Sequence, residues 1–125
     1  MARWFVISSL LLALGAAVPA WADDREDCKN AASLAKTDPA RAAAACRVLA
    51  GQGVAAAQYI LGLLYGLGRG VPEDDVQSYM WLDLAAARGN AAAVKARDDL
   101  FFVMTPAQVA QAKSLVAAWK PTTGQ

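Results

Sequence analysis

Residues 56–89, AAQYILGLLYGLGRGVPEDDVQSYMWLDLAAARG, decide the fold of this 125-residue chain. Two apolar stretches stand on either side of a loop that contains three glycines and one proline. Asp74 followed by Gln77 is the capping-box pattern of a helix start, and Gly89 stands where a helix is expected to end. The sequence therefore predicts two helices, over residues 54–66 and 74–88, that pair as a hairpin.

The same pattern recurs with a period of 36 residues, because GVAAA at 53–57 aligns with GNAAA at 89–93. Asp38, Asn90 and Thr105 are capping residues, and prolines directly follow the first and the third of them. The other predicted helices span residues 24–36, 39–52, 91–103 and 106–120. Six helices in three antiparallel hairpins make an all-α protein, a short α-solenoid. A high alanine content with few aromatic residues also favours closely packed helices.

Four short motifs follow one another within residues 56–89: Leu-Gly-x-x-Tyr, Gly-x-Gly-Val-x-x-Asp, a tryptophan, and Ala-Ala-x-x-Gly. In this order they resemble the Sel-one-like repeat, a relative of the tetratricopeptide repeat. The resemblance rests on Leu61, Gly62, Tyr65, Gly68, Gly70, Val71, Asp74, Trp81, Ala85, Ala86 and Gly89. Asp75 and Ser78 depart from it, since an aromatic residue and an alanine are usual there. The resemblance implies a helical scaffold in which these residues form the framework.

The resemblance is full over residues 54–89 and degenerate on both sides. Residues 24–53 have no glycine-rich loop, and residues 90–119 have Thr105-Pro106 in its place. Atypical end repeats are usual in solenoids, where they cap the stack. We therefore expect one repeat domain over residues 23–120, followed by a disordered tail at 121–125.

The first 22 residues have the three parts of a secretory signal: a short basic start with Arg3, an apolar run over residues 4–18, and Pro-Ala-Trp-Ala at 19–22. An uncleaved membrane anchor is the alternative, but the run is shorter than the roughly 20 apolar residues that span a bilayer. Cleavage after Ala22 would leave a chain of residues 23–125 without a membrane span. The expected location is the periplasm.

Cys28 and Cys46 are the only cysteines of the chain, and each is nine residues from Thr37. If residues 37–39 form the turn of a helical hairpin, equal distances along its two arms bring the two thiols to the same height. An exported protein meets an oxidising compartment, so a disulfide is the expected outcome. A redox or metal-binding pair is the alternative, but it needs closer spacing such as Cys-x-x-Cys.

Composition excludes several classes of function. The chain has no histidine, which removes histidine-based catalysis and histidine metal sites. Acidic runs at 73–75 and 98–99 are explained by helix capping and by solvated helix faces, and the glycines at 66–70 lack the pattern of a phosphate loop. Nearly balanced charge argues against a nucleic-acid partner. We expect no enzyme activity, no metal and no cofactor.

The remaining candidate is the concave face that a solenoid forms from the first helix of each repeat. By analogy with the tetratricopeptide arrangement, this face carries Tyr59, Leu63, Leu67, Lys95 and Asp99. Further packing within the molecule could instead cover the same row. The sequence thus predicts an adaptor or regulatory module that binds a protein or peptide in the cell envelope, with its oligomeric state open. The alternative is a β-lactam-binding or β-lactamase-like enzyme, as in cysteine-rich relatives of this repeat.

Overall fold

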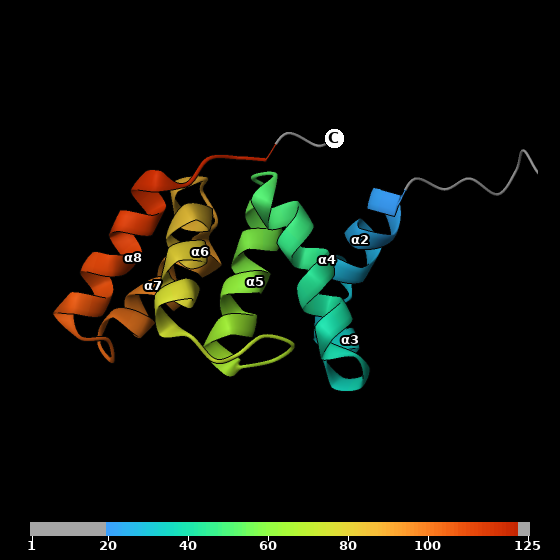
Figure 1. Ribbon diagram of the computed structural model, residues 1–125, viewed down its shortest axis with the longest axis horizontal. Coiled ribbons are helices and arrows are strands. Elements are labelled where there is room, and N and C mark those ends of the chain that lie inside the picture. The colour runs from blue at the N-terminus through green and yellow to red at the C-terminus, as the bar shows by residue number, and fades with distance from the viewer. Residues whose placement is uncertain (1–19, 123–125) are drawn as a thin grey trace, which may run out of the picture.

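The computed structural model describes residues 20–122, and this part of the chain is helical without strands (Figure 1). The helices follow one another along the long axis of the molecule. Their bounds are α2 (Ala20–Lys29), α3 (Ala31–Thr37), α4 (Pro39–Gly51), α5 (Ala55–Leu67), α6 (Asp75–Ala87), α7 (Ala91–Phe101) and α8 (Pro106–Ala118). The predicted all-α repeat fold is confirmed.

The predicted signal peptide lies mostly outside the described residues, since the description starts at Ala20. Its last three residues, Ala20–Ala22, form the first turn of α2. Within residues 20–122 no helix has the length and apolar character needed to cross a membrane.

The first predicted helix, residues 24–36, is wrong as a single element, because the chain breaks at Asn30 into α2 and α3. Asn30 has φ −92° and ψ 15°, which is outside the helical region. Its side-chain amide donates to Glu26 Oε1 at 3.0 Å instead of capping α3. Asparagine is a weak helix former because its side chain competes for local hydrogen bonds. The break allows both short helices to pack against α4.

The other helix starts follow the cap chemistry of the sequence. Side-chain oxygens of Asp38, Asp74, Asn90 and Thr105 each accept a hydrogen bond from the backbone N–H three residues on. Thr105 forms a complete capping box with Gln108. The box predicted at Asp74 is only half formed, because the Asp74 N–H donates to the Tyr65 carbonyl oxygen at 3.0 Å. That bond ties the start of α6 to the last turn of α5.

A disulfide joins Cys28 of α2 to Cys46 of α4, as the hairpin argument predicts. Both cysteines are buried in the main core, which small residues of α4 share with larger ones of α5 and α6. The core members are Cys28, Ala31, Ala42, Ala45, Cys46, Leu49, Ala50, Ala57, Leu61, Met80, Trp81 and Leu84. The alanines let the helices of neighbouring repeats lie close together, and the disulfide fastens the N-terminal helix to this core.

The glycine-rich loop between α5 and α6 folds back onto α4. Val71 is buried against Ala43 and Leu64. Gly70 has φ +73°, and a Cβ at this position would collide with the Pro39 carbonyl oxygen at the start of α4. Glycine is therefore required here both for its backbone conformation and for its size.

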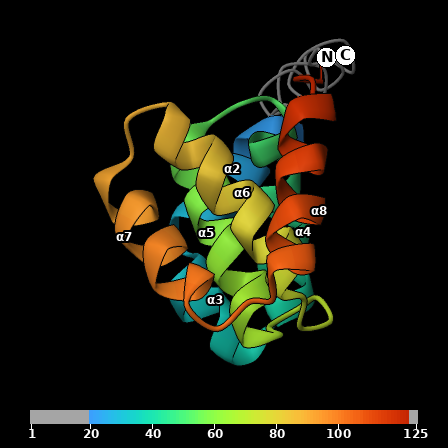
Figure 2. The same cartoon turned by 90° about the vertical axis from the view of Figure 1, so that its left-hand side faces the viewer.

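The third helix pair is more open than the second. Helix α7 ends at Phe101 instead of the predicted Val103, and only residues 102–105 connect it to α8. Helices α7 and α8 both pack against α6 and have few contacts with each other. Figure 2 shows α7 on one side of α6 and α8 on the other. The last two helices thus flank α6 instead of closing on each other.

Of the predicted disordered tail, residues 121–122 follow α8 without helical structure, and residues 123–125 lie outside the described residues. The chain after α8 runs back across the top of the molecule in Figure 1. Trp119 packs edge-on to Trp81, with ring centroids 6.4 Å apart, and the Arg88 guanidinium lies 5.5 Å from the Trp119 ring. The Thr122 N–H donates to the Gly51 carbonyl oxygen at 2.8 Å. This backbone bond and the ring contacts hold the tail in place.

Candidate protein-interaction face

Tyr59 and Leu63, two of the predicted binding residues, are half-buried on α5. Tyr59 packs on the cluster of Leu82, Ala85 and Ala93, and so fills the junction of α5 with α6 and α7. Burial at this junction makes Tyr59 first of all a packing residue. Tyr59 therefore lies at the edge of the exposed surface of α5.

Leu67, the third predicted residue of α5, is 62% exposed in the last turn of the helix. It shares the outer face of α5 with Leu63 and with two residues nearer the N-terminus, Ala56 and Ile60. At 100° per residue these four side chains fall within about 60° of each other around the helix. We call Ala56, Ile60, Leu63 and Leu67 the α5 strip. It is apolar throughout and at least partly exposed at every position.

Lys95 and Asp99, the predicted residues of the next repeat, lie exposed on α7 and bind each other. Lys95 Nζ is 2.8 Å from Asp99 Oδ2. The hydrogen bond from Lys95 to this carboxylate raises the Lys95 pKa above its usual value. Such a solvated pair adds little stability. It forms an exposed charged patch of both signs on α7.

A small apolar cavity of about 220 Å³ opens at the N-terminal end of the α5 strip. Ala56 and Ile60 of the strip line it together with Cys28, Leu49, Val54 and Ala57, and Arg25 and Lys29 of α2 border it. No sequence pattern predicts this cavity. It forms where α2 lies against α4 and α5, and only the Cys28–Cys46 pairing hints at the approach of α2.

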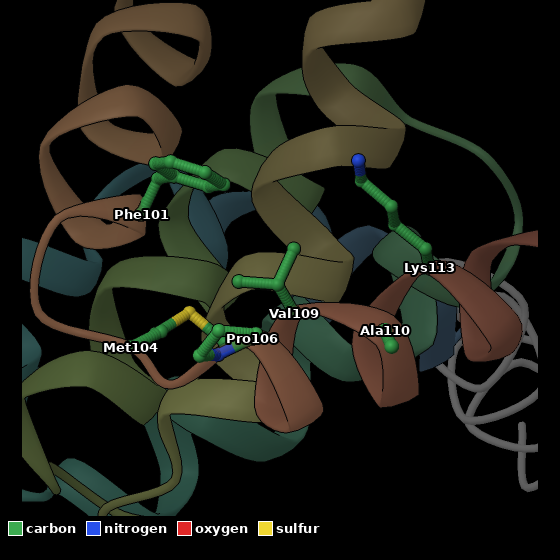
Figure 3. A pocket seen from close by; sticks show the side chains of 6 residues that line it. All are labelled: Phe101, Met104, Pro106, Val109, Ala110 and Lys113. Carbon is green, nitrogen blue, oxygen red and sulfur yellow. The ribbon is translucent and has the colours of Figure 1, made fainter.

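A second apolar cavity lies at the other end of the molecule, between the end of α7 and α8 (Figure 3). Its volume is about 400 Å³. In Figure 3 the side chains of Phe101, Val109 and Lys113 surround the opening, and Met104 and Pro106 lie below it. No sequence pattern predicts this cavity either, although the run Phe101-Phe102-Val103 beside it is apolar and exposed.

Most acidic side chains of interest are engaged in structural bonds. Asp74 caps α6. Arg97 binds Asp83 at 2.8 Å and Asp98 at 3.1 Å. Both hydrogen bonds raise the Arg97 pKa, and the bond to Asp83 has the larger effect. Among residues 20–122 no cluster of three or more acidic or cysteine side chains is arranged to hold a metal ion.

The match to a known family falls on the hairpin that carries the α5 strip. Residues 55–90 match the family model of the Sel1 repeat. These residues are a Sel1 repeat. No curated protein and no solved structure gives a significant match to the chain. The family match covers α5, the glycine-rich loop and α6, and it agrees with the resemblance drawn from the motifs.

The framework residues of the Sel1 repeat lie where the hairpin needs them. Leu61 and Ala85 are fully buried, Val71 and Trp81 are buried, and Asp74 caps α6. The Tyr65 hydroxyl accepts a hydrogen bond from Arg47 of the preceding helix at 3.0 Å. Sel1 repeats generally mediate protein–protein interaction.

Proposed function

We propose that this protein is an exported, periplasmic binding module that holds an apolar segment of another protein along the α5 strip. The proposal combines the secretory pattern of residues 1–22 with the interaction role of Sel1 repeats. The two cysteines support it as well, because a buried disulfide suits an oxidising compartment.

The observation that carries the proposal is the continuity of the α5 strip with the cavity beside the disulfide. Ala56 and Ile60 belong to both, and Leu67 ends the strip 11 residues further on. At 1.5 Å per residue the strip is about 16 Å long, which matches about five residues of an extended peptide. A cavity of about 220 Å³ at one end is large enough to take one apolar side chain of that peptide as an anchor.

The borders of the strip give the bound segment an orientation. Arg25 and Lys29 border the cavity end, whereas Tyr59 borders the α7 side, where it packs on Ala93. A partner segment with an apolar anchor and a carboxylate close to it would meet cations at the cavity. Charges at a rim mainly determine specificity and association rate, and the buried anchor supplies most of the affinity.

Photocrosslinking in the periplasm tests the proposal. A photoreactive residue at Leu67 should capture a partner, and one at Val48, an exposed apolar position on α4, should not. The captured protein is then purified and tested for binding to the wild-type chain and to Leu63→Asp. Loss of binding in Leu63→Asp supports the strip, and equal capture at both positions contradicts it. Hydrolysis of a chromogenic β-lactam by the purified protein would favour the enzyme alternative.

The location has its own test. Mass spectrometry of the protein recovered from the periplasm should show a chain that begins at Asp23. Recovery of the chain with residues 1–22 still attached, or from the cytoplasm alone, would contradict the proposed export.

A further inference from the structure

The end of α7 exposes three consecutive apolar side chains. Phe101 is 50% exposed, Phe102 83% and Val103 73%. The two phenylalanine rings contact each other edge to face, with centroids 6.0 Å apart. We call these three residues the end patch. Contiguous apolar surface of this kind on a small protein marks an interaction site.

The end patch is bare because the third helix pair lacks the long loop of the Sel1 repeat. In the Sel1 repeat Val71 closes the cluster with Ala43 and Leu64, and in the third pair Met104 fills the corresponding place beside Tyr79. Residues 102–105 are too few to fold any further over α7. The same opening between α7 and α8 leaves the 400 Å³ cavity accessible from outside.

A projection and a recess therefore lie side by side on one surface. Phe102 projects, and the ring of Phe101 next to it forms one wall of the cavity that Met104 and Val109 complete. A two-fold symmetric dimer needs a surface that complements itself, with the same patch in both copies. The end patch and its cavity meet this requirement, because the cavity is larger than a phenylalanine side chain.

We infer that this end of the molecule binds a second copy of the same chain, with Phe102 of each copy inserted into the cavity of the other. The inference does not depend on the α5 strip. Charge is compatible with the same occupant: Lys113 borders the cavity on α8, and the Arg97–Asp98 ion pair lies on α7 one turn before Phe102. A surface with both signs can pair with itself across a two-fold axis, whereas an anionic membrane favours an excess of cations.

The overall charge also permits the dimer. The predicted mature chain, residues 23–125, has equal numbers of cationic and anionic side chains. Proteins with a net charge close to zero have little long-range repulsion between copies. Nothing in the charge balance therefore opposes association through the end patch.

Sedimentation of the purified chain over a range of concentrations tests the inference. We expect a monomer–dimer equilibrium in the wild type, and Phe102→Asp should raise its Kd by at least about 30-fold, as for the loss of an interface anchor. Val48→Asp is the matched control, because it places the same charge on another exposed apolar residue, one on α4. It should dimerise like the wild type. Circular dichroism confirms that both variants are folded.

A wild type that stays monomeric at every concentration overturns the inference, and so does a Phe102→Asp variant that dimerises normally. A photoreactive residue at position 102 then identifies the contact. Trypsin releases residues 98–113 as one peptide, and a two-fold dimer gives a cross-link between two copies of it. A cross-link to any other part of the chain, or binding of the protein to anionic vesicles through Phe102, contradicts the two-fold arrangement. Phe102 is not a member of the α5 strip, so capture by the Leu67 probe is a separate measurement that tests the proposed function alone.

Discussion

The Ser78 hydroxyl donates a hydrogen bond to the Gly62 carbonyl oxygen at 2.7 Å, at the place where α5 and α6 lie against each other. A Cβ on Gly62 would be 2.8 Å from Leu82 Cγ and 3.2 Å from the Ser78 carbonyl oxygen. Serine here departs from the alanine that is usual in the resemblance, and its hydroxyl converts a van der Waals contact into a polar one. The pair holds the two helices of the Sel1 repeat at a short distance.

Gly62→Ala should lower the free energy of unfolding by about 1–3 kcal/mol, the usual cost of overpacking a core. The added methyl group can only be accommodated by moving Leu82 or the α6 backbone. Denaturant unfolding measures the change. Gly66→Ala is the control one turn later, where a Cβ would meet only the Ser78 hydroxyl at 3.1 Å. Because alanine favours helix, Gly66→Ala should be neutral or slightly stabilising, and an equal loss in both variants would contradict the steric explanation.

Replacing Cys28 and Cys46 by serine should lower the free energy of unfolding by about 3 kcal/mol, as expected for a cross-link that closes a loop of 18 residues. The loss should fall on the N-terminal part, because the disulfide joins α2 to α4. Hydrogen exchange should therefore show faster exchange in α2 and α3 than in α6. Hydrogen exchange of the reduced wild type is the parallel measurement. If exchange became equally faster in all helices up to α8, the stabilisation by the disulfide would not be local.

The sequence predicts the central hairpin well because its signals are local. Asp74 begins α6 by binding a backbone group three residues away, and the period of 36 residues reveals the neighbouring helices. The break at Asn30 was missed because it depends on how α2 and α3 both reach α4. The position of Thr122 was missed for the same reason, since its partner Gly51 is far away in the sequence.

In the candidate face, too, the sequence predicts what depends on one helix and not what depends on contacts between helices. Analogy between repeats places Leu63 and Leu67 on the concave face of the solenoid, and the structure leaves both at least partly exposed. The same analogy gives no hint that Tyr59 packs at the junction with α7, or that Lys95 and Asp99 bind each other. Both cavities depend on contacts between helices, so a periodic pattern within a single helix cannot predict them.

Trp119→Ala should lower the free energy of unfolding by about 2–3 kcal/mol, less than a fully buried tryptophan because this ring is half-buried. The ring contacts Trp81 of α6 and the guanidinium of Arg88, the residue that follows α6 as its C-cap. Loss of these contacts should also release the tail, so the amide of Thr122 should exchange faster with solvent. Arg88→Gln removes only the cation–π contact and should cost less than about 1 kcal/mol. Unchanged exchange at Thr122 in Trp119→Ala would show that the tail is held independently.

Deprotonation of Tyr79 should lower the free energy of unfolding as the pH rises above about 10. Burial raises the Tyr79 pKa, and the nearby Asp83 carboxylate raises it further. The phenol therefore loses its proton more easily in the unfolded chain than in the folded one. Its contribution is fully present below the unfolded pKa and is lost as the pH rises through the folded pKa.

Thermal unfolding between neutral and alkaline pH measures this loss, and Tyr79→Phe should show a smaller decrease than the wild type. The Lys95 pKa is raised by Asp99, so part of the alkaline decrease should remain in the variant. Absorbance of the phenolate gives a direct reading, because the wild-type minus Tyr79→Phe difference isolates one group. That difference should titrate above the usual phenol value of about 10. A titration at or below that value would show that the Tyr79 ring is accessible to water.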